Sequence, residues 1–161
     1  MPSNSRLAND AWEALLTAHA VLIKKLEADD IWQGISIREY DVLYTLSKCP
    51  APIRPSELHR NVLLSQPALS RMVDRLVARG LVQRAKDSHD RRSVRLSLTE
   101  RGAERQRAIG GRHGVSVARA MTSALDEDEL RQLKSICRKL AQGETLITNH
   151  RRRTVPDDQP E

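Results

Sequence analysis

The stretch DSHDRRSVRLSLTERG, residues 87–102, limits the possible folds of this chain more than any other part. Its first six residues, 87–92, are rich in turn formers. The next segment, SVRLSL at 93–98, alternates polar and apolar residues as a strand with one buried face does. Residues 81–86 are predicted to be the partner strand. The stretch therefore predicts a two-stranded hairpin that leads directly into a helix capped by Thr99.

The helix predicted after the hairpin carries three interior glycines, Gly110, Gly111 and Gly114. Each such glycine costs about 1 kcal/mol relative to alanine. Two interpretations stay open. Either the helix is kinked or broken there, or another helix, which could belong to a second subunit, approaches closely. The segment LDEDEL then begins a last helix, with Asp126 and Glu129 as a capping pair.

Two short helical segments precede the hairpin. The first, PSELHRNV at 55–62, begins with a proline, which suits a first helical turn. The second covers 65–80, with Ser65 as N-cap, Pro67 in the first turn and Gly80 as the stop signal. About three residues separate the two segments. Two short helices joined in this way are typical of a helix-turn-helix.

Two more helices are predicted nearer the N-terminus. Residues 9–28 place apolar side chains at helical spacing over a wide stripe. Residues 36–48 form a second helix, with Ser36 and Glu39 placed as a capping box. The sequence CPAP at 49–52 ends that helix, because proline disfavours helical backbone in the residue before it.

The positive charge of the chain lies in its middle third. The net charge is +6, and residues 54–112 hold 14 Lys/Arg against 6 Asp/Glu, a net +8. This distribution is typical of a nucleic-acid contact surface, although a solvated basic surface gives the same count. There is no Phe, and all Trp and Tyr residues precede the basic region, so bases cannot stack on aromatic rings there. Duplex DNA is the favoured target.

A helix-turn-helix followed by a hairpin is a winged helix, a mainly α fold with a small β-hairpin wing. We expect the recognition helix to enter the major groove and the wing tip, 87–92, to lie along the backbone or in the minor groove. Asp90 can hold Arg91 or Arg92 in one geometry before DNA binds. The alternative is an exposed turn with a weak surface ion pair. The helix-turn-helix directly upstream favours the wing.

Six positions of this region reproduce the pattern D-x-R-x-x-x-L-x-L-T-x-x-G of MarR-type (multiple antibiotic resistance regulator) transcription factors. They are Asp90, Arg92, Leu96, Leu98, Thr99 and Gly102. The segment LLSQPALSRMVDRLVARGLVQR resembles the recognition helix and first wing strand of the family, and LDEDEL resembles the opening of its last helix. The resemblance covers about residues 9–143. It implies a homodimer with interlaced terminal helices, a double-stranded operator of two inverted half-sites, and repression that a small ligand usually relieves.

The predicted organisation follows from this resemblance. It consists of an N-terminal tail at 1–8, a dimerisation helix at 9–35, a winged helix-turn-helix lobe at 36–98, C-terminal dimerisation helices at 99–145 and a disordered polar tail at 146–161.

The recognition helix, 65–79, separates its side chains onto two faces. The core face is predicted to hold Leu69, Met72, Val73 and Leu76. The predicted DNA contacts are Ser65, Gln66, Pro67, Ala68, Ser70, Arg71 and Arg75 in the helix, and Asp90, Arg91 and Arg92 in the wing. Gln66 suits adenine, Arg71 suits guanine or phosphate, and Ala68 can pack on a thymine methyl group. Asp74 would repel phosphate, so we expect it to orient Arg71 or Arg75.

All four aromatic residues fall in the first two helices and their linker, where the resemblance places a ligand pocket. The candidate lining residues are Trp12, His19, Trp32, Arg38, Tyr40 and Tyr44. They suit a small aromatic or phenolic effector, with Arg38 as counter-charge. The alternatives are that these residues pack the core and the dimer interface, or that the regulator has no ligand. Urate is disfavoured, because Leu16 and Arg60 replace the charged residues of the urate-responsive branch.

Other function classes find little support. Cys49, Cys137 and the five scattered histidines have no metal-ligand spacing, so we predict no metal and no cofactor. There is no catalytic motif, which indicates that the chain is not an enzyme. With no apolar run of bilayer length and no secretory signal, we expect a soluble cytoplasmic protein with no membrane partner. A winged-helix protein–protein interaction module is the alternative, which the paired wing arginines disfavour.

Overall fold

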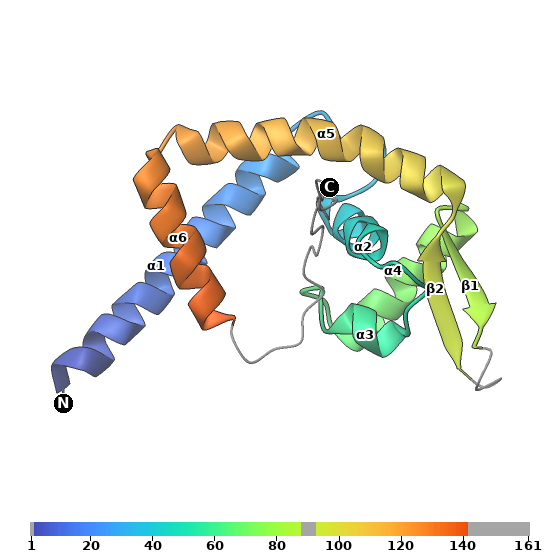
Figure 1. The fold of residues 1–161 in the computed structure, drawn as a ribbon, viewed down its shortest axis with the longest axis horizontal. Helices are drawn as coiled ribbons and strands as arrows, with labels where there is room; N and C mark the ends of the chain where they lie inside the picture. Colours follow the sequence, from blue (N-terminus) through green and yellow to red (C-terminus); the bar gives the residue numbers. More distant parts are fainter. Residues whose placement is uncertain (1, 88–92, 142–161) are drawn as a thin grey trace, which may run out of the picture.

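A long helix, α5, joins two differently built parts of the molecule (Figure 1). The computed structural model describes residues 2–87 and 93–141. Beside the first half of α5 lie α2, α3, α4 and the hairpin, which we call the lobe, and beside its other end lie α1 and α6, the terminal helices. The elements are α1 (Pro2–Glu27), α2 (Ile37–Ser47), α3 (Pro55–His59), α4 (Gln66–Ala78), β1 (Val82–Lys86), β2 (Val94–Leu98), α5 (Glu100–Thr122) and α6 (Glu127–Leu140). The predicted fold class, mainly α with a small β-hairpin, is confirmed.

The local signals read from the sequence set most helix boundaries. Each predicted N-cap accepts a hydrogen bond from the backbone N–H three residues later. The caps are Ser36, Ser65, Thr99 and Asp126. At Ser36 and Asp126 the glutamate three residues on completes the capping box, so both predicted boxes are confirmed. Gly80 follows α4 with φ of 67°, a left-handed conformation that favours glycine and ends the helix.

Two boundaries differ from the prediction. The first helix begins at Pro2, so residues 2–8, expected to be a tail, are helical. Proline suits a first helical turn, and Leu7 continues the apolar spacing of the later residues. The helix-turn-helix connection is also longer, because six residues rather than about three separate α3 from α4. The Asn61 side chain donates to the Glu57 carbonyl (2.7 Å), a local bond that competes with further helix after α3.

The glycines of α5 have different surroundings. The helix runs from Glu100 to Thr122 without a break. A Cβ at Gly110 would lie 3.0 Å from the Tyr40 hydroxyl oxygen, so the close approach of another helix is confirmed there, and that helix is α2 of the same chain. A Cβ at Gly102 would lie 1.9 Å from the Leu81 carbonyl oxygen. Only glycine therefore allows α5 to begin against the end of α4 and the start of β1.

The wing is an antiparallel pair whose register runs from Val82 opposite Leu98 to Lys86 opposite Val94. Each strand is one residue shorter than predicted. Ile53, in the loop before α3, adds a bridge to Leu96, with two backbone hydrogen bonds of 3.0 and 2.8 Å. The hairpin is therefore joined to the chain segment that leads into the helix-turn-helix.

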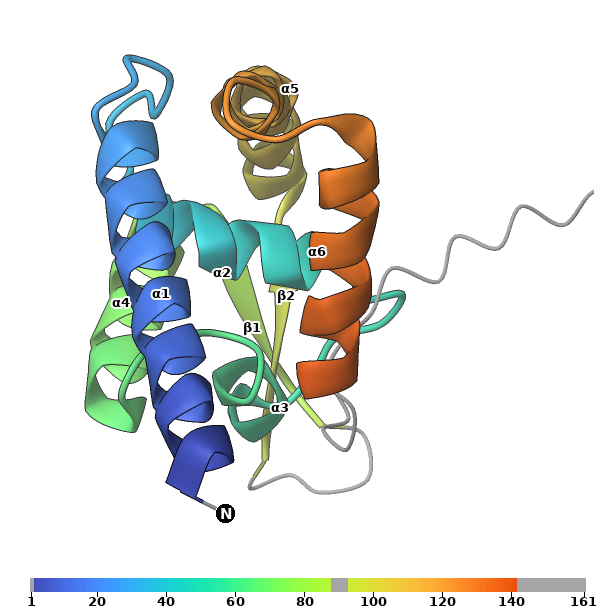
Figure 2. The same ribbon diagram turned by 90° about the vertical axis from the view of Figure 1, so that its left-hand side faces the viewer.

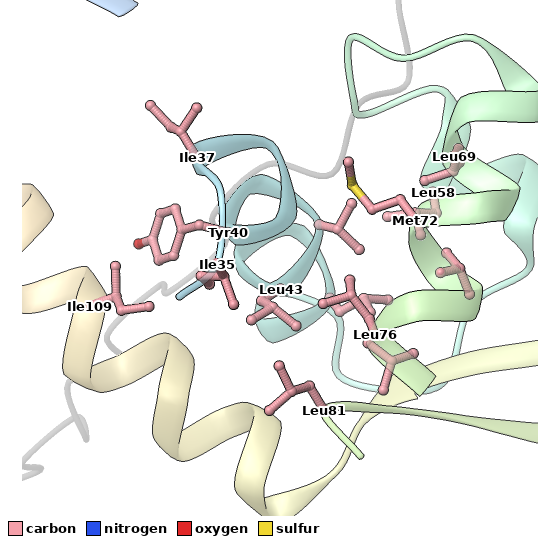
Figure 3. Packing of buried hydrophobic residues seen from close by; sticks show 14 of the residues in the cluster. Ile35, Ile37, Tyr40, Leu43, Leu58, Leu69, Met72, Leu76, Leu81 and Ile109 are labelled. Carbon is pink, nitrogen blue, oxygen red and sulfur yellow. The ribbon is translucent and has the colours of Figure 1, made fainter. Parts of the chain in front are cut away.

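The core lies inside the lobe and against α5. Leu43 of α2, Leu58 of α3, Leu76 of α4 and Ile109 of α5 are completely buried. Figure 3 shows side chains from these helices converging on one interior, with Tyr40 pointing towards Ile109. The predicted core face of α4, namely Leu69, Met72, Val73 and Leu76, is confirmed. This packing fixes which face of α4 points outward.

The terminal helices bury little of their surface in the single chain. All residues of α1 from Ser5 to Val21 are exposed, including Trp12, whose exposed fraction is 58%. No residue of α6 is buried, and Ile136 and Leu140 are exposed. Figure 2 shows both helices extending away from α5. In the described part of the chain, no helix is long and apolar enough to cross a membrane.

Candidate nucleic-acid interface

The outer face of α4 presents the predicted DNA-contacting residues together. Ser65, Gln66, Pro67, Ser70 and Arg71 are all exposed, and Ala68 is half-buried beside them. The Ser65 hydroxyl accepts the Ala68 N–H, so it caps the helix as well as lying on this surface. The separation into a core face and a polar face that periodicity predicted is therefore present.

The partner predicted for Asp74 is wrong. We expected this carboxylate to orient Arg71 or Arg75 of the same helix. Instead, it accepts a hydrogen bond of 2.6 Å from Arg84 of β1. Periodicity along one helix could not reveal this pairing, because Arg84 reaches α4 only when the hairpin folds back on it. The pair links the recognition helix to the wing.

Arg75, a predicted DNA contact, lies beside a carboxylate of α2. Its Nε is 3.7 Å from Glu39 Oε1, and Arg79 Nη1 is also 3.7 Å from that oxygen. The Glu39 carboxylate is largely buried and also accepts the Ser36 N–H at 2.8 Å. Arg79 also donates to the Gly34 carbonyl at 3.0 Å. The end of α4 is thus attached both to the cap of α2 and to the loop before it.

The predicted contacts of the wing tip, Asp90, Arg91 and Arg92, lie outside the described residues. The base of the wing is described, and it holds a cluster that sequence reasoning missed. Asp87, whose side chain is 1% exposed, accepts hydrogen bonds from Arg54 (3.4 Å) and Arg95 (2.9 Å). Hairpin register is the signal that could have found it. Because Ala85 lies opposite Arg95, Asp87, two residues further on, shares the face of Arg95.

A cavity of about 450 Å³ lies between α4 and the wing. Pro55, Gln66, Ser70 and Arg84 contribute to its lining, together with apolar side chains from α4 and β2. One cavity is therefore bordered by the first residue of α3, the exposed first turn of α4 and the wing.

Three of the predicted ligand residues form an aromatic cluster. The ring centroids of Trp32 and Tyr40 are 5.7 Å apart, and those of Tyr40 and Tyr44 are 5.9 Å apart in a stacked arrangement. His113 of α5 completes the cluster at 5.2 Å from both Trp32 and Tyr40. Sequence reasoning missed His113, because only the packing of α5 on α2 brings it there.

The cluster favours neutral side chains. Burial lowers the pKa of His113, while Asp29 acts in the opposite direction. Its Nδ1 is buried and has no hydrogen-bond partner among the described residues. Burial also raises the pKa of the Tyr40 hydroxyl, against the opposing effect of its hydrogen bond with Gln106. Burial thus favours the neutral forms of His113 and Tyr40.

The other predicted ligand residues lie elsewhere in the chain. His19 and Arg38 line a separate cavity of about 110 Å³, with Asp41 and residues of the α3–α4 connection. Trp12 is exposed on α1. The six predicted residues thus occupy three places rather than one pocket, because linear proximity in two helices does not fix which faces they present.

The cysteines and histidines form no metal cluster among the described residues. The Cys49 thiol donates to the Thr45 carbonyl (3.3 Å), and burial raises its pKa, which disfavours the reactive thiolate. Cys137 is exposed on α6.

A short helix α3, an outward-facing α4 and an anchored two-stranded wing define a winged helix-turn-helix protein of the DNA-binding class. The comparisons with known proteins give the family. The MarR family model matches residues 35–94. The multiple antibiotic resistance protein MarR of Escherichia coli is 32% identical over 106 residues, covering 66% of this chain and 73% of that protein. The chain belongs to the MarR family of transcriptional regulators.

Two further relatives extend the comparison. The transcriptional repressor MdtR of Bacillus subtilis is 33% identical over 112 residues, covering 69% of this chain and 70% of that protein. The crystal structure of Sco3205, a MarR family regulator from Streptomyces coelicolor, in complex with DNA superposes with a TM-score of 0.73 at 26% identity. It covers 84% of this chain and 86% of that one.

Proposed function

We propose that this protein is a dimeric transcriptional repressor, and not an enzyme, that binds an inverted-repeat operator in duplex DNA. The observation that carries the proposal is the exposed polar face of α4, which the wing borders on one side. Two relatives of the protein also support the proposal. MdtR is named a repressor, which supports negative regulation, and Sco3205 is described in complex with DNA, which supports DNA as the binding partner.

The residues of α4 suggest a division of roles. Gln66 and Arg71 can make bidentate hydrogen bonds to base edges in the major groove, and Ser70 can bind phosphate. Within the described residues, Arg71 forms no ion pair, so its guanidinium is available. Arg92 of the wing tip is proposed to contact the backbone or the minor groove.

The terminal helices support a dimer. The apolar stripe of α6 includes Leu133, Ile136 and Leu140, and no residue of the helix is buried, so a single chain covers this stripe only in part. Trp12 and Leu7 on α1 leave a second apolar surface uncovered. A second copy of the chain can cover both surfaces. It also supplies the second recognition helix that an operator of two half-sites, about one helical turn apart, requires.

A second proposed property is the response to a small aromatic acid or phenol. The aromatic cluster supports it, because Trp32 packs against Tyr40 with the two rings tilted by 60°, while the next residues of its loop, Gln33 and Gly34, bind Arg105 and Arg79. A molecule inserted beside Trp32 would therefore move a loop attached to the end of α4. The test is a screen of aromatic acids against the DNA complex. We expect Tyr44→Ala, a substitution in this cluster, to change the response more than the ligand-free affinity. A screen without effect on binding or Tm would contradict it.

Selection of duplexes from a random pool, followed by a salt titration, tests the main proposal. We expect one inverted-repeat sequence to be enriched, with an affinity that falls steeply as salt rises because phosphate contacts release counterions. A winged-helix module for protein partners would enrich no sequence and would bind duplex DNA weakly. That result would replace the proposed function by the alternative.

A further inference from the structure

The charged cluster at the base of the wing has a role that goes beyond anchoring a hairpin. We propose that Arg54 is a phosphate contact of the DNA complex, held in position by the buried carboxylate of Asp87. The proposal rests on the proposed function as a DNA-binding protein. It adds a binding residue that lies outside both the recognition helix and the wing tip.

The pairing of backbone segments brings the cluster together. Ile53 bridges Leu96 in antiparallel fashion, so Arg54 and Arg95 are the next pair of neighbours across the two segments. Side chains that are directly opposite one another share a face of a sheet. Asp87 extends β1 on the same face, because Ala85, two residues earlier, lies opposite Arg95. Two guanidinium groups and one carboxylate therefore meet on a single face.

Asp87 is fixed more firmly than a surface carboxylate. Its side chain is 1% exposed, and a charge removed from water in this way is stable only when it is paired and hydrogen-bonded. Its backbone N–H also donates to the Ser93 carbonyl at 3.0 Å. The carboxylate thus provides a rigid point of attachment for the arginines.

The two arginines use their donors differently. Arg95 is committed to the protein, since Nε and Nη2 bind Asp87 (both 2.9 Å) and Nη1 donates to the Pro52 carbonyl (3.1 Å). Arg54 gives Asp87 one bond of 3.4 Å through Nη2, and its side chain is 49% exposed. Arg54 therefore keeps donors that face solvent, and the three side chains together carry a net charge of +1.

Arg54 lies next to the residues proposed to contact DNA. Its neighbour Pro55 borders the same cavity as Gln66 and Ser70, which lie on the outward face of α4. Asp87 directly precedes the wing segment 88–92 in the chain. Arg54 thus lies beside α4, the proposed recognition helix, and at the base of the wing. A guanidinium held in one geometry binds phosphate with less loss of entropy than a free side chain.

The test is Arg54→Ala, which leaves Asp87 its shorter bonds to Arg95 and so keeps the wing attached. Fluorescence anisotropy would measure binding to a selected operator and to a scrambled duplex across a KCl series. We expect affinity to fall about 10-fold for each lost charged hydrogen bond on both duplexes, hence about 100-fold for a dimer that loses two. The slope of log affinity against log salt should shrink by about 0.9 for each lost phosphate contact, hence about two for a dimer.

Two further variants and a control complete the test. Arg54→Lys should keep most of the salt slope, because the charge remains. Asp87→Asn should weaken binding less than Arg54→Ala, because it releases the guanidinium without removing it. Arg131→Ala on α6 is the matched control, since this exposed arginine is also paired with carboxylates but lies outside the lobe, and its slope should not change.

Three results would overturn the inference while the wild-type protein still binds its operator. They are unchanged affinities for Arg54→Ala, a lower Tm with an unchanged salt slope, and a loss confined to the operator, which would indicate a base contact. A wild-type protein that binds neither duplex would contradict the proposed function itself.

Discussion

The lobe and the terminal helices differ in how much of their apolar surface this chain covers by itself. In the lobe, leucines from α2, α3 and α4 are completely buried, and α5 closes one side with Ile109. In α6 no side chain is buried, and most of α1 is exposed. The same chain thus contains a part that packs around its own core and a part whose apolar surface stays largely uncovered in the single chain.

This difference also separates two kinds of stability. Burial in the lobe is intramolecular, so its contribution does not depend on protein concentration. In the proposed dimer, the terminal helices gain their burial through association, so their contribution follows mass action. Substitutions in the two parts should therefore be distinguishable by varying concentration alone.

The largest expected effect comes from a charge on the apolar stripe of α6. Ile136→Asp should convert the dimer to a monomer, because an unpaired carboxylate at an interface is costly to bury. Loss of the linked second half-site should weaken operator binding by at least about 100-fold. Sedimentation velocity and anisotropy would measure both. Ser135→Asp, on the opposite side of α6, adds the same charge and should leave the dimer intact. Equal behaviour of the two variants would contradict a dimer built on this stripe.

A substitution that creates a cavity in the core of the lobe should lower the stability of the lobe rather than that of the dimer. Leu76→Ala removes a completely buried side chain, and we expect a loss of about 2–5 kcal/mol in the free energy of unfolding. Thermal unfolding should show the same loss at every protein concentration. Leu7→Ala, on exposed α1, should lower Tm at protein concentrations where the dimer forms and should have little effect when the protein is dilute enough to be monomeric. If both variants depended on concentration in the same way, the lobe would not be the independent unit described above.

Substitutions in α4 and in the wing tip should differ in how much they reduce the preference for the operator over a scrambled duplex. Gln66→Ala should cost about 1–3 kcal/mol on the operator and less on a scrambled duplex, as for a base contact. Arg92→Ala should weaken binding to both duplexes by similar factors and reduce the salt slope by about one unit per subunit. Anisotropy across a salt series would measure these changes. Unchanged affinity of Arg92→Ala for both duplexes would exclude the wing contact.

The smallest expected effect is on the pH dependence of stability. Burial lowers the pKa of His113 in the folded chain below its ordinary value of 6.5, so the unfolded chain binds the proton more readily. His113 should therefore contribute stability above pH 6.5 that is lost as the pH falls through the lowered value. Thermal unfolding between pH 8 and pH 5 should show a decline that is smaller for His113→Gln. An identical decline in both proteins would show that other groups cause it.

Much of the fold follows from local sequence signals. The caps at Ser36, Ser65, Thr99 and Asp126 depend on residues within one helical turn, and the core face of α4 depends on helical period. These features need no knowledge of the rest of the chain. The start of α1 was placed too late, because Met1, which precedes Pro2, is not a residue type that signals a helix start.

The site was less predictable where residues distant in sequence meet. Asp74 binds Arg84 and Arg54 binds Asp87 only after the hairpin packs on the helix-turn-helix. His113 joins Tyr40 only because Gly110 allows α5 to approach α2. Sequence period shows which face of an element is polar, but it does not show which element that face will meet.

The mass of the operator complex tests the central claim most directly. A duplex selected by the wild-type protein would be titrated at high and low salt, and sedimentation velocity would give the mass of the complex. We expect two chains on one inverted repeat, with half-sites about one helical turn apart and binding that weakens as salt rises. A single chain bound with full affinity, or a complex that is insensitive to salt, would contradict it.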